Sequence, residues 1–344
     1  MSVRVHAKIG VHSRLKKLKK LIFAAGATAV VGVGLLVAVS LWSGLHVFAG
    51  IWNLLLPHPD AVENNPRLTI EQNHKVLWRG SIANYEIDES SALTASPTHE
   101  GILWTLNDSG GTPTLYAVGT DGASHGEYSY SDAPAFDWES LDAFTEEGQP
   151  LLLVGDVGDN LRWRRYVTLY VLHEPEDLNK PEEPLLLKRS IDVVYPHGPR
   201  DCEAIAVDGK RNRILMLSKR QSPPELYAIP LQSEGQVEAQ PVASLLGMPK
   251  PTEADYQRAS DLAPYLYMPT GMDVNGDRLL VTTYQHMFLF DLNALEEPPV
   301  KIPLPIVGQR EAVTFDQSGT VVFTTSERID PTYSAELFSI TVSD

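Results

Sequence analysis

The sequence is nearly devoid of cysteine: Cys202 is the one cysteine in 344 residues. An intrachain disulfide is therefore impossible, and the fold cannot depend on covalent cross-links. Cys202 lies in the apolar stretch DCEAIAV with Arg200 as the one basic residue nearby, which predicts a small buried side chain rather than a reactive thiolate. Neither an HExxH motif nor a Cys/His ligand pair is present, so the usual sequence evidence for zinc is missing.

Acidic residues are absent from residues 1–56, whereas seven Lys and Arg precede residue 21. Residues 21–42 then run for 22 positions without a charge, long enough for a helix to cross a bilayer core of about 30 Å. We predict a cytoplasmic basic tail at 1–20, a transmembrane helix at 21–43 and a juxtamembrane stem at 44–67, because basic flanks stay in the cytoplasm. The alternative is a cleaved signal peptide, whose apolar core is usually shorter at roughly 7–15 residues.

This topology predicts a single-pass inner-membrane protein whose large domain lies in the periplasm or outside the cell. Residues 57–344 contain 21 Lys and Arg against 44 Asp and Glu, a formal charge of −23. Such a domain repels polyanions, so nucleic acid is excluded as a partner. The charge is compatible with cation binding and, equally, with a purely solubilising role.

Helical periodicity is almost absent outside residues 21–56, and five stretches share a different pattern. Each begins with a small residue and an apolar anchor, followed by a polar turn, an aliphatic strand such as ILWTL or VVFTT, a loop, and a strand containing Leu-Tyr, Leu-Phe or Phe-Leu. Short apolar strands bounded by turns indicate antiparallel β structure. The five stretches are 89–118, 137–172, 201–229, 269–292 and 311–340.

The spacing of the anchors predicts an all-β propeller over residues 68–344. A four-stranded blade takes about 40–50 residues, and the anchors are 48, 64, 67 and 41 residues apart. Five blades with insertions, or six with one degenerate blade, both fit. A strand within 68–80 would complete the ring beside the last blade, and 174–188 and 231–262 are expected to be loops between blades. The anchors are Leu93, Leu141, Ile205, Met272 and Val313.

Three motifs resemble those of a group of largely uncharacterised bacterial membrane-anchored β-propeller proteins. They are NDSGG (107–111) followed by Leu-Tyr, DWESL (137–141), and LLLVGDVGDN with its Arg-rich continuation (151–165). The resemblance covers about residues 80–342 and implies a relation to esterase-like, phytase-like and SdiA-regulated propellers. It implies no agreed activity, and the acidic motif of true propeller phytases is missing, since SDAPAF (131–136) departs from it.

Repeated acidic positions at the starts of the predicted innermost strands form the first candidate site. A propeller gathers these starts at one face, so we expect Glu139, Glu203 and Glu311 to lie close together. Converging carboxylates bind a cation or protons, or stay solvated, and hard oxygen ligands suit Ca²⁺. The alternative is structural, each glutamate capping its own blade. Neighbouring candidates for ligand binding are Asp108, Asp137, Lys219 and Glu327.

The segment Asp156–Asn160 is a second candidate site. Asp156, Asp159 and Asn160 surround a glycine that permits a sharp turn, and such a loop can wrap Ca²⁺; a turn held by Asx hydrogen bonds explains the same residues. Arg162 and Arg165, with the arginine between them, are expected either to meet an anionic ligand or to neutralise the local acids.

These residues leave two functions open. The first is a membrane-tethered module that binds a periplasmic ligand or protein. The second is a Ca²⁺-dependent phosphoesterase or esterase-like hydrolase that uses the converging carboxylates. Propellers host both functions. The sequence favours the binding module, because Ser109 has no locally paired histidine and no phosphate-binding motif is recognisable.

Overall fold

The computed structural model describes residues 76–342 apart from 109–111, 132–134, 259, 261–262, 285, 305–309 and 329–334. The described residues belong to one compact unit, Pro59–Asp344. The predicted tail, transmembrane helix and stem lie outside them and stay predictions. No helix in the described part of the chain is long and apolar enough to span a membrane.

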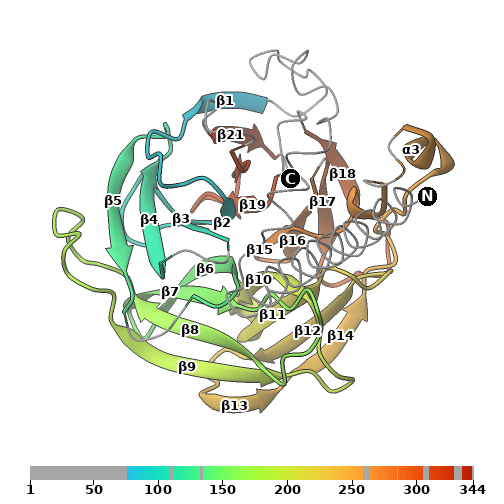
Figure 1. The fold of residues 1–344 in the computed structure, drawn as a ribbon, viewed down its shortest axis with the longest axis horizontal. Helices are drawn as coiled ribbons and strands as arrows, with labels where there is room; N and C mark the ends of the chain where they lie inside the picture. Colours follow the sequence, from blue (N-terminus) through green and yellow to red (C-terminus); the bar gives the residue numbers. More distant parts are fainter. Residues whose placement is uncertain are drawn as a thin grey trace, which may run out of the picture. The chain divides into compact units, whose positions relative to one another are not determined.

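The described strands form five antiparallel sheets arranged as the blades of a propeller (Figure 1). Blade 1 contains β2 (Ser90–Ala95), β3 (Ile102–Asn107), β4 (Thr114–Gly119) and β5 (Ser124–Ser129); blade 2 contains β6 (Trp138–Glu146), β7 (Gln149–Asp156), β8 (Val167–His173) and β9 (Leu187–Val194); blade 3 contains β10 (Cys202–Asp208), β11 (Arg213–Ser218), β12 (Glu225–Pro230) and β14 (Gln240–Ser244). Blade 4 contains β15 (Gly271–Asn275), β16 (Arg278–Thr282), β17 (His286–Asp291) and β18 (Val300–Pro303); blade 5 contains β19 (Ala312–Phe315), β20 (Val321–Thr325), β21 (Glu336–Thr341) and β1 (Val76–Ser81).

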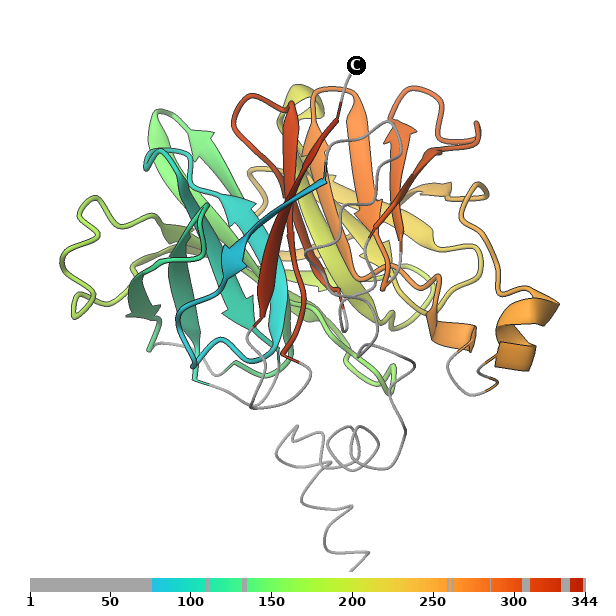
Figure 2. The same cartoon turned by 90° about the horizontal axis from the view of Figure 1, so that it is seen from above.

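The innermost strands close a ring, which confirms the five-bladed alternative. Strands β2, β6, β10, β15 and β19 contact one another in that cyclic order, and β19 returns to β2. Strand β1 joins the two ends of the described chain by completing blade 5: it pairs antiparallel with β21 from Val76↔Ile340 to Ser81↔Glu336. The predicted strand within 68–80 therefore does complete the last blade. In Figure 2 the sheets are seen from the side, with their strands running between two faces.

Burial explains why these segments became strands. The second strands ILWTLN, ILMLS and VVFTT are apolar and β-branched, and their central residues are buried between neighbouring blades. The long anchor intervals come from insertions. Blade 2 carries a loop at 174–186 before β9. The stretch 231–262, expected to be a loop, instead contains β14, β13 (Gly235–Glu238) and α3 (Glu253–Arg258), so that prediction was wrong. Strand β13 adds parallel to β9 as a fifth strand of blade 2.

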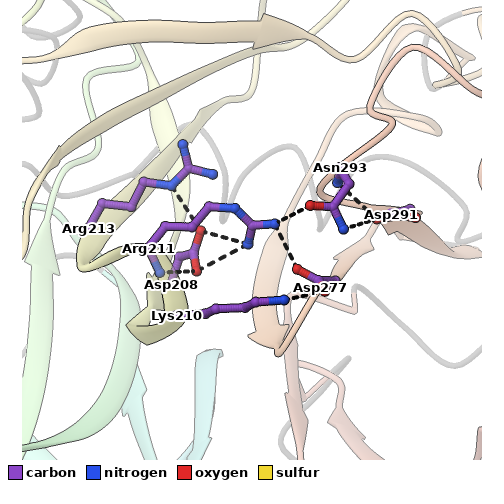
Figure 3. A network of polar contacts seen from close by, with 7 residues as sticks. All are labelled: Asp208, Lys210, Arg211, Arg213, Asp277, Asp291 and Asn293. Carbon is purple, nitrogen blue, oxygen red and sulfur yellow. Dashed lines mark hydrogen bonds and ion pairs between the residues drawn. The ribbon is translucent and has the colours of Figure 1, made fainter.

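Polar contacts lock neighbouring blades together at the face where the innermost strands end. Between blades 3 and 4, Arg211 donates to Asp277 and Asn293 at 2.7 Å each, and also pairs with the buried Asp208, as Figure 3 shows. Between blades 1 and 2, the buried Glu174 accepts hydrogen bonds from Ser96, Thr98 and Trp104. Comparable contacts link the other pairs: Arg189 with the Leu231 carbonyl, Arg278 with the Gly319 carbonyl, and Gln317 with the Ser96 carbonyl.

Candidate metal centre

One position repeats at the face where the innermost strands begin, which we call the start face. It lies two residues before each anchor, and its side chains are almost completely buried. In three blades the residue is the extra one of a β-bulge: Trp138 pairs with Asp156 and Ser140 with Gly155, which leaves Glu139 unpaired in the ladder. A bulge re-aims a side chain that would otherwise alternate across the sheet. The five ring residues are Ser91, Glu139, Glu203, Thr270 and Glu311.

Lys219 supplies an internal cation for this ring. It follows β11, and its Nζ lies 3.0 Å from Glu203 Oε2. Burial alone lowers the pKa of Lys219, but the negative charges around it, chiefly that of Glu203, outweigh burial and hold the pKa above its ordinary value. On the other side of the ring, the Ser91 hydroxyl donates to Glu311 Oε2 at 3.4 Å. Glu203 and Glu311 thus have partners inside the protein.

Three carboxylates of blades 1 and 2 lie close together at the start face. One oxygen from each of Asp108, Asp137 and Glu139 lies within 4.8 Å of the others, and this is the one such group of His, Cys, Asp and Glu among the described residues. Burial, followed by the charge of Asp108, raises the pKa of Asp137 to about 7 and the pKa of Glu139 well above its ordinary value. Glu139 is only 3% exposed and makes no hydrogen bond to a described residue.

Gly158 makes room for this acidic group. A Cβ at residue 158 would lie 2.8 Å from Glu139 Oε1 and closer still to Asp137 Oδ2. The absence of a side chain therefore lets two carboxylates approach the backbone of the 156–160 loop. The negative charges of these carboxylates repel one another and help to raise the pKa values of Asp137 and Glu139, and a divalent cation is a group that their oxygens would bind. The donors present fit a hard cation such as Ca²⁺.

The loop 156–160, predicted to be a Ca²⁺ site itself, is held by protein donors. Asp156 accepts from Arg164 at 2.8 Å and from the Asp137 N–H at 3.2 Å. Asp159 accepts the N–H groups of Trp163 and Arg164 at 2.9 Å each. Asn160 accepts from Arg220, which also pairs with Asp201. These contacts explain the loop as an Asx-type turn without an ion, so the acidic group beside it is the better candidate for a metal centre.

Arg162 and Arg165 are exposed and form no ion pair within the described part of the chain. The arginine that neutralises the local acids is Arg164, which pairs with Asp156, donates to the Gly158 carbonyl and stacks on Phe136 at 5.1 Å. Arg162 adopts a left-handed backbone (φ 53°) that the Asp159 bonds support. The sequence alone does not show which of the three arginines neutralises the local acids, because the conformation of the turn decides which side chain points inward.

The other candidates divide between the start face and the core. Glu327 follows β20, and its charge acts on Tyr284, whose pKa is raised mainly by burial. Cys202 is buried as predicted, and burial raises the pKa of its thiol to about 12. Ser109 lies outside the described residues. One G-x-S-x-G pentapeptide, GASHG at 122–126, starts in the turn between β4 and β5 and continues into β5, so it is not the strand-to-helix elbow of a hydrolase.

Comparison with known proteins gives structural likeness alone. No protein-family model matches the sequence, and no curated protein does. Among solved structures, a gluconolactonase from Xanthomonas campestris shares 12% identity over 79% of this chain and 91% of its own, with a TM-score of 0.44. A luciferin-regenerating enzyme shares 11% identity over 74% and 79% (TM-score 0.39), and the WD40 repeats of RRP9 share 12% over 74% and 80% (TM-score 0.38). Likeness at this level says nothing about activity, and the propeller assignment rests on the sheet topology.

Proposed function

We propose that this protein is a membrane-anchored, extracytoplasmic propeller that binds a ligand through a divalent cation held at its start face. The observation that carries the proposal is the group formed by Asp108, Asp137 and Glu139. Glu139 is buried, Asp137 and Glu139 lie against a glycine that leaves room for their oxygens, and the nearby cations Lys219 and Arg164 pair with Glu203 and Asp156 instead. Three carboxylates suit Ca²⁺, whose remaining ligands would be water and ligand oxygens.

The proposed side of the membrane on which the propeller lies rests on the sequence alone. The uncharged run at 21–43 and the basic tail before it support an anchor with the propeller on the opposite side of the membrane. The ligand would then be a periplasmic or extracellular molecule.

The test is thermal unfolding of the full-length protein in detergent after chelator treatment. Addition of Ca²⁺ at about 100 times its dissociation constant should stabilise the wild type by about 2.7 kcal/mol. Glu139→Gln should lose most of this gain, whereas Glu238→Gln, an exposed glutamate on β13, should keep it. The proposal fails when neither Ca²⁺, Mg²⁺ nor Mn²⁺ at millimolar concentration raises the melting temperature, or when Glu139→Gln responds like the wild type.

The pH dependence of the same melts provides a second measurement. Without metal, Asp137 has a folded-state pKa of about 7, above its unfolded value, so its contribution to stability is full below about pH 4 and lost as the pH rises through about 7. A cation binds the ionised form and competes with the proton. The stabilisation by Ca²⁺ should therefore grow from pH 5 to pH 8, and a gain independent of pH would place the ion elsewhere.

A hydrolase is the second candidate, and one observation favours it. Burial raises the pKa of Glu203 to about 8 although Lys219 lowers it, so this carboxyl group titrates near neutrality, as general acid–base catalysis requires. Ca²⁺-dependent hydrolysis of p-nitrophenyl acetate or p-nitrophenyl phosphate, lost in Glu203→Gln, would support it. If the protein binds Ca²⁺ but hydrolyses neither ester, the binding function is supported and the hydrolase is not.

A further inference from the structure

The pair formed by Glu203 and Lys219 leaves one buried polar atom without a partner. Glu203 Oε2 contacts Lys219 Nζ at 3.0 Å, whereas Glu203 Oε1 is buried and accepts no hydrogen bond from the described residues. Glu203 is 3% exposed and Lys219 8%. A buried carboxylate oxygen without a donor costs free energy, and native structures rarely leave such an atom unsatisfied unless something else binds there.

Glu203 is the extra residue of a β-bulge in β10, as Glu139 is in β6. Cys202 pairs with Ser218 and Ala204 with Leu217, which leaves Glu203 as the extra residue. Its charge helps to raise the pKa of Glu139 on the neighbouring blade. Glu203 therefore lies near the acidic group of Asp108, Asp137 and Glu139, because its charge and that of Asp108 act on each other as well.

The chemistry of the pair selects the group that binds. An acceptor, Glu203 Oε1, stands beside a donor, the Lys219 ammonium, and a hydroxyl group can donate to one and accept from the other. When Glu203 is ionised, the pair has no net charge, so a charged group gains little from it. An ammonium group would meet the Lys219 charge, and a carboxylate would meet the ring glutamates.

We propose that Glu203 and Lys219 form a hydroxyl-binding subsite, and that the ligand is an uncharged, hydroxyl-rich molecule of the polyol or saccharide class. This inference rests on the proposed function, because other hydroxyl oxygens of the same ligand would complete the coordination of the cation held by Asp108, Asp137 and Glu139. Ca²⁺ accepts neutral oxygen ligands of this kind.

The experiment uses three probes that share one ring and differ in charge: galactose, galacturonate and galactosamine. Each is added to the full-length protein in detergent, with Ca²⁺ or with chelator, and bound probe is detected by saturation-transfer NMR. Galactose should give the strongest signal with Ca²⁺ and lose it with chelator. Glu203→Gln and Lys219→Met should each reduce the galactose signal at least fivefold, while the exposed-site controls Glu238→Gln and Lys180→Met keep it.

Ca²⁺-dependent melting of the same samples separates the two proposals. If Ca²⁺ does not raise the melting temperature of the wild type, the proposed metal centre is wrong. A wild type that binds Ca²⁺ but none of the probes would overturn the subsite alone. Galactosamine binding in chelator would show a site for organic cations, and preferred binding of galacturonate would show an anion site at Lys219; either result contradicts the subsite. The wild-type comparison holds even where a variant fails to fold.

Discussion

Single residues decide whether the start face can hold a cation, and Gly158 shows this most directly. Glu139 was recognisable in the sequence because acidic residues recur before the anchors, and Asp137 adjoins it. The glycine that lets Asp137 and Glu139 approach the backbone of the 156–160 loop was not recognisable, because its role depends on a Cβ that is absent. The bulges at Ser91, Glu139 and Glu203 were equally invisible, since a one-residue shift in pairing leaves no mark on the pattern of apolar residues.

Gly158→Ala should therefore weaken cation binding without unfolding the protein. The new methyl group displaces the carboxylates of Asp137 and Glu139, and we expect the Ca²⁺-induced rise in melting temperature to fall by more than half. Gly209→Ala is the matched control, because a Cβ there meets nothing within 4 Å. Equal Ca²⁺ responses in the two variants, measured by differential scanning fluorimetry, would contradict this account of the site.

At the scale of elements, the innermost strands are joined by side chains that accept backbone N–H groups of the next blade. Asp142 of β6 accepts the Val207 N–H of β10 at 2.6 Å, and Asp273 of β15 accepts the Phe315 N–H of β19 at 2.6 Å. Both residues directly follow an anchor. Burial raises the pKa of Asp142 to about 6, with the Val207 N–H opposing the shift.

Asp142→Ala should destabilise the propeller by about 1–3 kcal/mol, because it leaves the buried Val207 N–H without an acceptor. Asp192→Ala on β9 removes a carboxylate that accepts the hydroxyl of Thr168 on β8, and should cost less than about 1 kcal/mol. Chemical denaturation of both variants provides the comparison. Similar midpoints would mean that this bond between blades is not needed for stability.

The elements themselves were largely predictable, because apolar strands and polar turns repeat with the blade. The sequence did not predict β13 or α3. Strand β13 reads GQVE and is mostly exposed, so no apolar alternation identifies it. Its pairing with β9 brings together segments from two blades, a non-local contact that local sequence cannot indicate. Helix α3 is six residues long and buries none of them, which leaves no apolar stripe to detect.

At the largest scale, the described strands form a closed ring of blades, and β1 completes its last blade. A chain that begins at residue 74 should fold and melt cooperatively, whereas a chain that begins at residue 83 should not. Without β1, strand β21 becomes an open edge, and such edges pair with other chains. Size-exclusion chromatography and thermal melts compare the two. A monomeric, cooperatively folded chain from residue 83 would show that the other strands close the ring unaided.

The pairing of β1 with β21 also constrains the order in which the blades can form during biosynthesis. Trp78 and its hydrogen-bond partner Glu336 are 258 residues apart. At about 5–20 residues per second, β1 leaves the ribosome roughly 10–50 s before its partner strand exists. Blades 1 to 4 consist of consecutive hairpins and can form during that interval. Blade 5 is completed only when β21 has been made, so a nascent chain that stalls before β21 remains an open ring.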